Sequence, residues 1–229
     1  MVEKPIDVSL EAADRILAAE RASGTKVAVV SQHRFDPSTE QVTAAIQAGD
    51  LGRLTSGIAS TAWWRGRSYY DSGRWRGTWA MDGGGAIMNQ TIHTIDLLVA
   101  MLGVPTEVFA YAGRLAHERV EVEDTAVAVV RFASDDQLVY FHHNPGPAPE
   151  LTMPLPMTET NQVTGADTLS ADQHRLGPAH VAQFADFVDA IRSERPVRVG
   201  TREARAVLAV VLGLYRSAAS GTPVPIEHG

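Results

Sequence analysis

Two periodicities alternate along this chain and predict a mixed order of helices and strands. Apolar residues spaced three or four apart, with capping and stop residues, predict helices at 10–23, 37–48, 86–102, 180–194 and 201–220. Continuous β-branched or alternating runs predict strands at 26–31, 54–64, 106–117, 125–133 and 137–143. The pattern predicts an α+β protein.

The last three predicted strands follow one another along the chain with short polar connections such as 134–136. Such a meander is antiparallel, and the alternation of Val108, Ala110 and Ala112 indicates a sheet covered by helices on one face. In the helix at 180–194, the apolar positions are expected to point inward; they are Val181, Phe184, Phe187, Val188 and Ile191. The fold class expected is a mostly antiparallel open sheet with helices on one face.

The front of the chain has a different pattern. The strand at 26–31 is β-branched throughout, as in a parallel sheet that is buried on both faces, and the few residues before Lys4 cannot supply its neighbours. We therefore expect residues 1–35 to be the remnant of a doubly wound nucleotide-binding domain, and residues 36–229 to form a C-terminal substrate-binding and oligomerisation domain. The α–β unit within residues 1–35 should expose apolar faces and unpaired strand edges. It should be poorly ordered or packed on a neighbouring chain.

Three glycines after Asp82 precede the helix at 86–102 and leave the backbone free for a close approach, which predicts a pocket at the helix start. On that helix Asn89, His93 and Asp96 stand at i, i+4 and i+7 and share a face within roughly 60° of arc. Two interpretations stay open. The three are satisfied core residues, or His93 is a proton-transfer group facing a cleft.

An aromatic and basic loop spans residues 63–79, and its substrate-binding candidates are Arg65, Tyr70, Trp75 and Arg76. Aromatic faces combined with Arg and Tyr donors suit recognition of a polyol, although a plain surface patch is the alternative. The stretch from 144 to 178 holds six prolines, which predicts an extended excursion whose role stays open.

Composition excludes several classes of protein. The 229 residues are 45% apolar and 21% charged, which suffices for a globular core. A formal net charge of -7 without a dense basic cluster disfavours nucleic acid and anionic membranes as partners. There is no cysteine, no apolar run long enough to span a membrane and no secretory pattern, so we expect a cytoplasmic protein.

The chain resembles the glucose–fructose oxidoreductase / inositol dehydrogenase (Gfo/Idh/MocA) family of NAD(P)-dependent oxidoreductases. The motifs that carry the resemblance are Glu3-Lys4-Pro5 before a helix from Ser9, Gln32-His-Arg34-Phe35, Trp75-Arg-Gly-Thr-Trp79, Asp82-Gly-Gly-Gly85 and Asn89-Gln-Thr-Ile-His93-Thr-Ile-Asp96. Together they cover nearly the whole chain and are far more specific than any one of them.

The resemblance implies a mostly antiparallel C-terminal domain that follows a Rossmann domain and dimerises through its sheet. It implies that Lys4 and His93 handle the hydroxyl proton, and it places Lys4, Pro5, Gln32 and Arg34 near the nicotinamide. Many relatives have Asp at position 89; because an amide cannot transfer protons as a carboxylate does, Asn89 is expected to bind substrate, beside Asp96. The family's Gly-rich phosphate loop is absent from this sequence.

Three hypotheses follow. The first is the substrate-binding and oligomerisation domain of an oxidoreductase acting on a sugar or polyol hydroxyl, from a truncated gene, a start error or a fragment. It would use NAD or NADP in a full-length parent, hold neither tightly alone, and form a homodimer or larger assembly. The second is a non-catalytic carbohydrate-binding or dimerisation protein. The third, a metal-dependent hydrolase, draws on His142-His143 and is disfavoured because no His-x-His or His-x-x-x-His pair is present.

Overall fold

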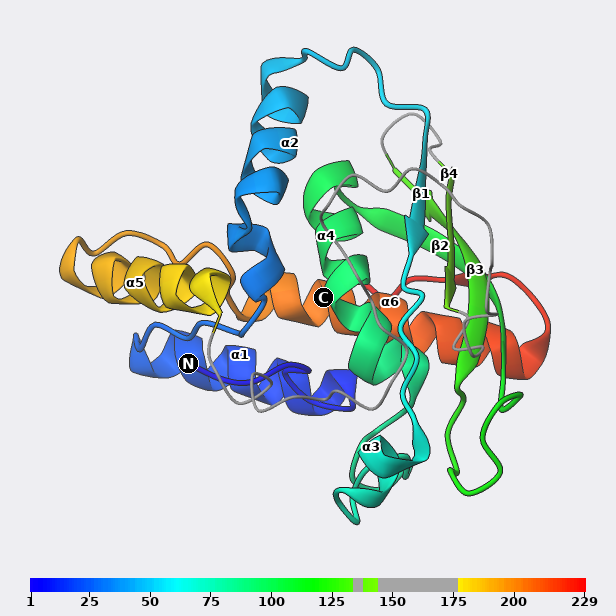
Figure 1. Ribbon diagram of the computed structural model, residues 1–229. Helices are drawn as coiled ribbons and strands as arrows, with labels where there is room; N and C mark the ends of the chain where they lie inside the picture. Colours follow the sequence, from blue (N-terminus) through cyan, green and yellow to red (C-terminus); the bar gives the residue numbers. More distant parts are fainter. Residues whose placement is uncertain (134–137, 144–176) are drawn as a thin grey trace, which may run out of the picture.

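A five-stranded sheet forms one side of the computed structural model, which describes residues 1–133, 138–143 and 177–229 (Figure 1). In spatial order its strands are β1 (Ser56–Ser60), β4 (Leu138–His143), β3 (Thr125–Phe132), β2 (Pro105–Gly113) and β5 (Val224–Pro225). β1 pairs parallel to β4, and the other pairs are antiparallel. The expected mostly antiparallel α+β fold is confirmed. The connection at 134–136 and nearly all of the proline-rich stretch lie outside the described residues.

Helices α4 (Ile92–Leu102) and α6 (Thr201–Ser220) lie on one face of this sheet (Figure 1). Val108 and Ala110 of β2 and Ala128 of β3 are buried in the core beneath them, which confirms the predicted alternation. On the other face, Tyr111 is 64% exposed and Ile58 is 81% exposed. One sheet face is therefore covered and the other carries exposed apolar side chains.

β2 ends at Gly113, four residues earlier than the alternation predicts. The cause is Asp124, whose carboxylate accepts hydrogen bonds from the backbone N–H groups of Leu115, Ala116 and His117 at 2.7–2.9 Å. These donors are turned away from the neighbouring strand, so the ladder cannot continue.

The N-terminal helices form where the capping residues predict them. α1 (Leu10–Ser23) begins after Ser9, whose hydroxyl accepts from the N–H of Ala12 at 3.2 Å, and it ends at Gly24, which has a φ of 68°. The 3₁₀ helix η1 (Gln32–Phe35) leads into α2 (Pro37–Ala48), with proline in its first turn.

The expectation of an exposed strand at 26–31 is wrong. Val29 forms a single parallel bridge with Val2 and is 1% exposed. Its backbone N–H also donates to the carbonyl of Val199 at 3.0 Å, just before α6. Segments far along the chain thus cover this stretch and satisfy its backbone, so it does not need a neighbouring molecule.

Helix α5 (Pro178–Arg192) also differs from the prediction, because its apolar stripe points outward. Val181, Phe184, Val188 and Ile191 are 58%, 41%, 43% and 49% exposed, and Phe187 is half-buried. The inward residue is Gln183, whose side chain accepts from Ser31 N–H at 3.0 Å and donates to Val29 O at 2.8 Å. An amide replaces a strand neighbour there, which an apolar side chain could not do. No helix in the described ranges is both long and apolar enough to cross a bilayer.

Candidate functional site

The central helix begins differently from the uniform α-helix that the sequence predicts. Residues Ala86–Thr91 form a π-helical turn, η2, and α4 follows from Ile92. Such wide turns are rare in proteins, and those that occur are often found at functional sites. Asn89 lies within this wider turn, whereas His93 and Asp96 lie in the regular helix after it, and each of the three meets a different partner.

The glycines before this turn allow other parts of the protein to pack closely against the backbone. A Cβ on Gly85 would overlap the backbone carbonyl of Glu123, and one on Gly84 would overlap the hydroxyl of Tyr215. The buried carboxylate of Glu123 accepts from the N–H of Ile87 at 2.8 Å and from the Tyr215 hydroxyl at 2.9 Å. The predicted close approach therefore exists at these two glycines, but its partners are protein atoms, and the pocket lies to one side.

Lys4 and Asn89 form the centre of the site. The Lys4 Nζ donates to the backbone oxygen of Asn89 at 2.8 Å and to its Oδ1 at 3.0 Å. The Asn89 amide donates in turn to Asp82 at 2.9 Å, and Gly77 N–H donates to the other Asp82 oxygen at 2.9 Å. These bonds fix which face of the amide is turned to the lysine and which to the carboxylate.

Burial sets the charge balance of this centre. It lowers the pKa of Lys4 from its ordinary 10.5; the carboxylates of Glu3 and Asp82 oppose the shift, and Arg65 and Arg76 add to it. Burial likewise raises the pKa of Asp82, which its hydrogen bonds and Lys4 oppose. Two ionisable groups are thus moved toward neutrality beside the same amide, as is common at functional sites.

A cleft of about 580 Å³ opens over these residues. Its polar lining comprises Glu3, Lys4, Asp7, Asp82 and Asn89, and Pro5, Trp75 and Met88 are among its apolar walls. The cis peptide bond between Lys4 and Pro5 lies in this wall. The cleft has the size and mixed lining of a small-molecule site.

His93 lies one turn further on. Its ring packs edge-to-face on that of His33, with centroids 5.2 Å apart. Burial lowers the pKa of His93 to about 3, and the positive charges of Lys4, His33 and His180 contribute. The imidazole is therefore neutral at neutral pH, with a ring nitrogen able to accept a proton.

Asp96 is paired with Arg34. The Arg34 Nε and Nη2 donate to its two carboxylate oxygens at 2.7 and 2.6 Å, and Asp96 is 4% exposed. This bidentate pair joins η1 to α4 and fixes the position of the Gln32–Phe35 turn. The side-chain oxygen of Gln32 in that turn is buried and accepts no hydrogen bond from any described residue.

The aromatic loop approaches the same region. Arg65 Nη2 donates to Gln90 Oε1 at 2.9 Å, and the Gln90 amide donates to the Tyr69 hydroxyl at 3.2 Å. The guanidinium of Arg76 lies 4.1 Å from the Tyr69 ring centroid and 4.4 Å from that of Trp75. The structure thus brings Arg65, Arg76 and Trp75 toward the site that begins at Lys4.

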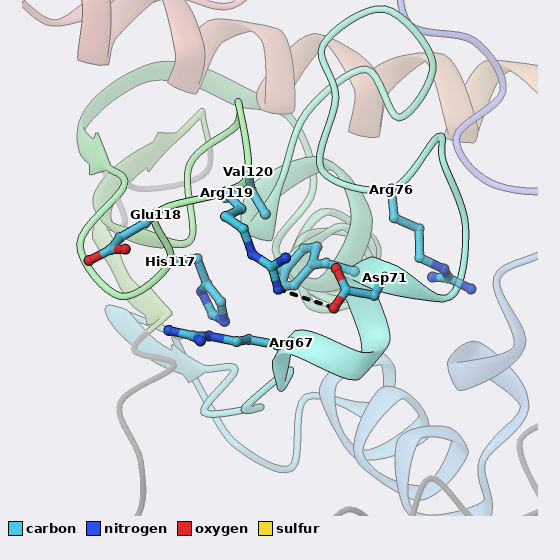
Figure 2. Close-up of a pocket in the computed structure, with 8 residues that line it drawn as sticks. Arg67, Asp71, Arg76, His117, Glu118, Arg119 and Val120 are labelled. Atoms are coloured by element: carbon cyan, nitrogen blue, oxygen red, sulfur yellow. Dashed lines mark hydrogen bonds and ion pairs between the residues drawn. The ribbon is translucent and has the colours of Figure 1, made fainter.

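Tyr70 occupies a second, smaller pocket of about 150 Å³. Figure 2 shows this pocket, with the ion pair between Arg119 and Asp71 in its middle and with Arg67 and Arg76 on either side. The Tyr70 ring packs on His117 with centroids 4.9 Å apart, and burial raises the pKa of its hydroxyl to about 12. Tyr70 is therefore a neutral donor set apart from the Lys4 centre.

Sequence reasoning missed three residues of the site, Asp82, Gln90 and His33. Asp82 stands directly before the three glycines and His33 lies inside a quoted motif, so both had a signal. Gln90 also lies inside a quoted motif, but the sequence does not predict its contact with Tyr69, which lies in the short helix α3 (Arg67–Asp71). Among the described residues, no group of three or more His, Asp and Glu side chains is arranged to hold a metal ion.

Comparison with known proteins finds similarity in both sequence and fold. Residues 39–144 match the model of the GFO/IDH/MocA C-terminal domain. YteT of Bacillus subtilis (strain 168), which carries the name of an oxidoreductase, is 34% identical over 116 residues, or 48% of this chain and 26% of YteT. The matched region thus spans about a quarter of that relative.

Solved structures share the whole fold. The WlbA dehydrogenase from Bordetella pertussis, solved with NADH and UDP-GlcNAcA, is 27% identical with a TM-score of 0.81, covering 100% of this chain and 72% of its own. An aldose-aldose oxidoreductase from Caulobacter crescentus, complexed with glycerol, is 20% identical with a TM-score of 0.75, covering 98% and 71%. Residues 39–144 are thus similar to the GFO/IDH/MocA C-terminal domain, and the chain as a whole has the fold of the WlbA dehydrogenase.

Proposed function

We propose that this chain is the substrate-binding and proton-transfer part of an NAD(P)-dependent oxidoreductase acting on a hydroxyl of a sugar or polyol. The observation that carries the proposal is the anchoring of Lys4 on Asn89 at the mouth of the 580 Å³ cleft. The WlbA structure, solved with NADH, supports the redox class. In this proposal Asp96 contacts substrate only indirectly, because it orients Arg34.

The residues present fit the nicotinamide end of such a cofactor in part. Lys4 and Pro5 line the cleft, and Gln32 keeps a buried oxygen without a partner among the described residues, which suits an amide donor. Arg34 is engaged with Asp96, and the sequence has no Gly-rich phosphate loop. When bound, the nicotinamide supplies the hydride acceptor or donor. Tight binding of the whole dinucleotide by this chain alone is not expected.

The chain's own residues would handle the proton of the substrate hydroxyl. Lys4 Nζ, held by two acceptors on Asn89, keeps a third donor position for a substrate oxygen. Neutral His93 would accept the hydroxyl proton as the carbon is oxidised, and it would return it in the reverse direction. The nearby positive charge of Lys4 stabilises the oxygen as it becomes anionic.

The test is binding followed by turnover. Saturation-transfer NMR with glucose, myo-inositol and glycerol should show contact with the chain, and Asn89→Leu should weaken it, whereas Thr55→Leu on the exposed surface should not. Turnover is measured as NADH formation with the same compounds. A chain that binds no sugar or polyol would contradict the proposal.

The second candidate is a non-catalytic carbohydrate-binding or dimerisation protein. The absent phosphate loop favours it, and the partly fitting nicotinamide end opposes it. Titration with NADH and NADPH separates the two, because saturable binding of either would rule out the non-catalytic alternative.

We also propose that the chain forms a homodimer through the uncovered sheet face. Tyr111 and Ile58 are exposed there, and the Phe109 ring packs edge-to-face on that of Tyr111 with centroids 5.0 Å apart. Apolar area of this kind on a flat sheet is typical of an interaction surface.

A further inference from the structure

The guanidinium of Arg76 is held by aromatic rings rather than by an ion pair with any described residue. This group lies between the rings of Tyr69 and Trp75, and within the part of the chain that the structure describes it donates no hydrogen bond and forms no ion pair. Even its Nε is buried without an acceptor. A structural arginine usually fills several of its five donors, so this side chain is clamped in place with its hydrogen-bonding capacity unused.

The charges around Arg76 are also unbalanced. Both Arg65 and Arg76 lower the pKa of Lys4, although the carboxylates of Glu3 and Asp82 oppose them more strongly. Asp82, which Arg76 also affects, already accepts from Asn89 and Gly77. Arg76 lines the pocket of about 150 Å³, where three arginines (Arg67, Arg76 and Arg119) face two carboxylates (Asp71 and Glu118). A pocket with this excess of positive charge attracts an anionic ligand.

We propose that the sugar or polyol bound here carries an anionic group, a carboxylate or a phosphate, and that Arg76 binds it. The inference rests on the proposed function and narrows its substrate class. The ring or chain of the substrate would lie in the cleft with its reacting hydroxyl at Lys4, and the oxyanion would reach past Trp75 to the guanidinium.

The geometry suits an oxyanion for two reasons. The planar fork of an arginine matches the two oxygens of a carboxylate or phosphate in a bidentate contact. The aromatic rings on Arg76 also fix its rotamer before the ligand arrives, which reduces the entropy lost on binding. The guanidinium of Arg65 lies over the same Tyr69 ring, 5.2 Å from its centroid, and its positive charge would attract the oxyanion without a direct hydrogen bond.

The experiment is calorimetric titration of the full chain with glucose, glucuronate, glucose 6-phosphate and inorganic phosphate at one ionic strength. We expect at least one of the two anionic sugars to bind about tenfold or more tightly than glucose, as a charge-assisted bidentate contact would give. The stronger of the two identifies the group as carboxylate or phosphate. Raising the salt concentration should narrow the difference.

Three variants isolate the role of Arg76. Arg76→Gln should abolish the preference for the anionic sugar while leaving glucose binding in place, and Arg76→Lys should retain part of it. Arg74→Gln, an exposed arginine two residues away, is the matched control and should change nothing. Circular dichroism and thermal melting of each variant verify that it is folded.

The outcomes separate the two proposals. Equal binding of glucose and both anionic sugars, or a preference that survives Arg76→Gln, overturns this inference and leaves the proposed function standing. Inorganic phosphate binding as tightly as the anionic sugar also overturns it, since the site would then be a simple anion site. If no sugar binds at all, the proposed function fails and the inference fails with it.

Discussion

The side chain of Lys4 reaches across 85 positions of sequence to donate to both oxygens of Asn89, at 2.8 Å to the backbone and 3.0 Å to the side chain. That backbone oxygen belongs to the π turn at Ala86–Thr91, a wide turn of the kind often found at functional sites. The candidate catalytic amine is thus positioned by the irregular start of the central helix.

The first prediction concerns the titration of Lys4. Competitive acetylation across a pH series, with Lys26 as the internal reference because the chain has only these two lysines, should place the pKa of Lys4 below 10.5. Asp82→Asn should lower it further, because the carboxylate favours the charged amine, and Arg76→Gln should raise it. A pKa of Lys4 at or above its ordinary value, or a rise in Asp82→Asn, would show that burial does not control this amine.

The second prediction links His93 to acid stability. Its folded pKa of about 3 lies below the ordinary 6.5, so the unfolded chain binds the extra proton between these values and stability falls as the pH is lowered through this window. At pH 5 the loss relative to pH 7 is about 2 kcal/mol from this group alone. His93→Gln should remove that part of the slope in urea unfolding measured at both pH values.

The control for His93 is His228→Gln, which removes an exposed imidazole near the C-terminus. It should leave the difference between pH 5 and pH 7 close to that of the unchanged chain. If His93→Gln and His228→Gln behave alike, the burial of His93 does not set its protonation, and its role as a neutral base loses its support.

Periodicity and capping predicted the fold well, and the reason is local. Ser9 and Gly24 bound α1, and the alternation from Val108 predicts which face of β2 is buried, because these signals act through neighbouring backbone. The outward stripe of α5 could not be predicted, because the inward side of this helix is set by hydrogen bonds between Gln183 and the backbone of Val29 and Ser31, over 150 residues earlier.

The sequence names candidate residues for the site but does not predict how they are arranged. Lys4, Asn89, Trp75 and Arg76 were named from motifs, and the structure brings them to one region. The backbone of Gly84 and Gly85 lies against protein atoms rather than against a ligand. This contact depends on Glu123, whose position relative to the helix start follows from tertiary packing alone.

The third prediction tests that packing. Gly85→Ala should destabilise the chain by about 3 kcal/mol or more, because its Cβ would overlap the Glu123 carbonyl and rigid backbone cannot yield. Gly113→Ala, whose Cβ would meet Leu115 at an ordinary 3.5 Å, is the control and should change stability by less than about 1 kcal/mol. Chemical denaturation of both variants measures the difference in stability. Similar denaturation midpoints would mean that the turn can accommodate a Cβ at Gly85.

The last prediction concerns assembly. If the uncovered sheet face forms a homodimer, Tyr111→Glu should convert the chain to a monomer in light scattering at micromolar concentration, because a charge buried without a partner in an apolar interface is costly. Leu51→Glu is the control, since Leu51 is 54% exposed beyond the end of α2, away from that face, and it should leave the mass unchanged. A monomer before any substitution would contradict the proposed dimer. A dimer that survives Tyr111→Glu and falls apart in Phe184→Glu would place the interface on the exposed stripe of α5 instead, because that stripe is another apolar surface exposed to water.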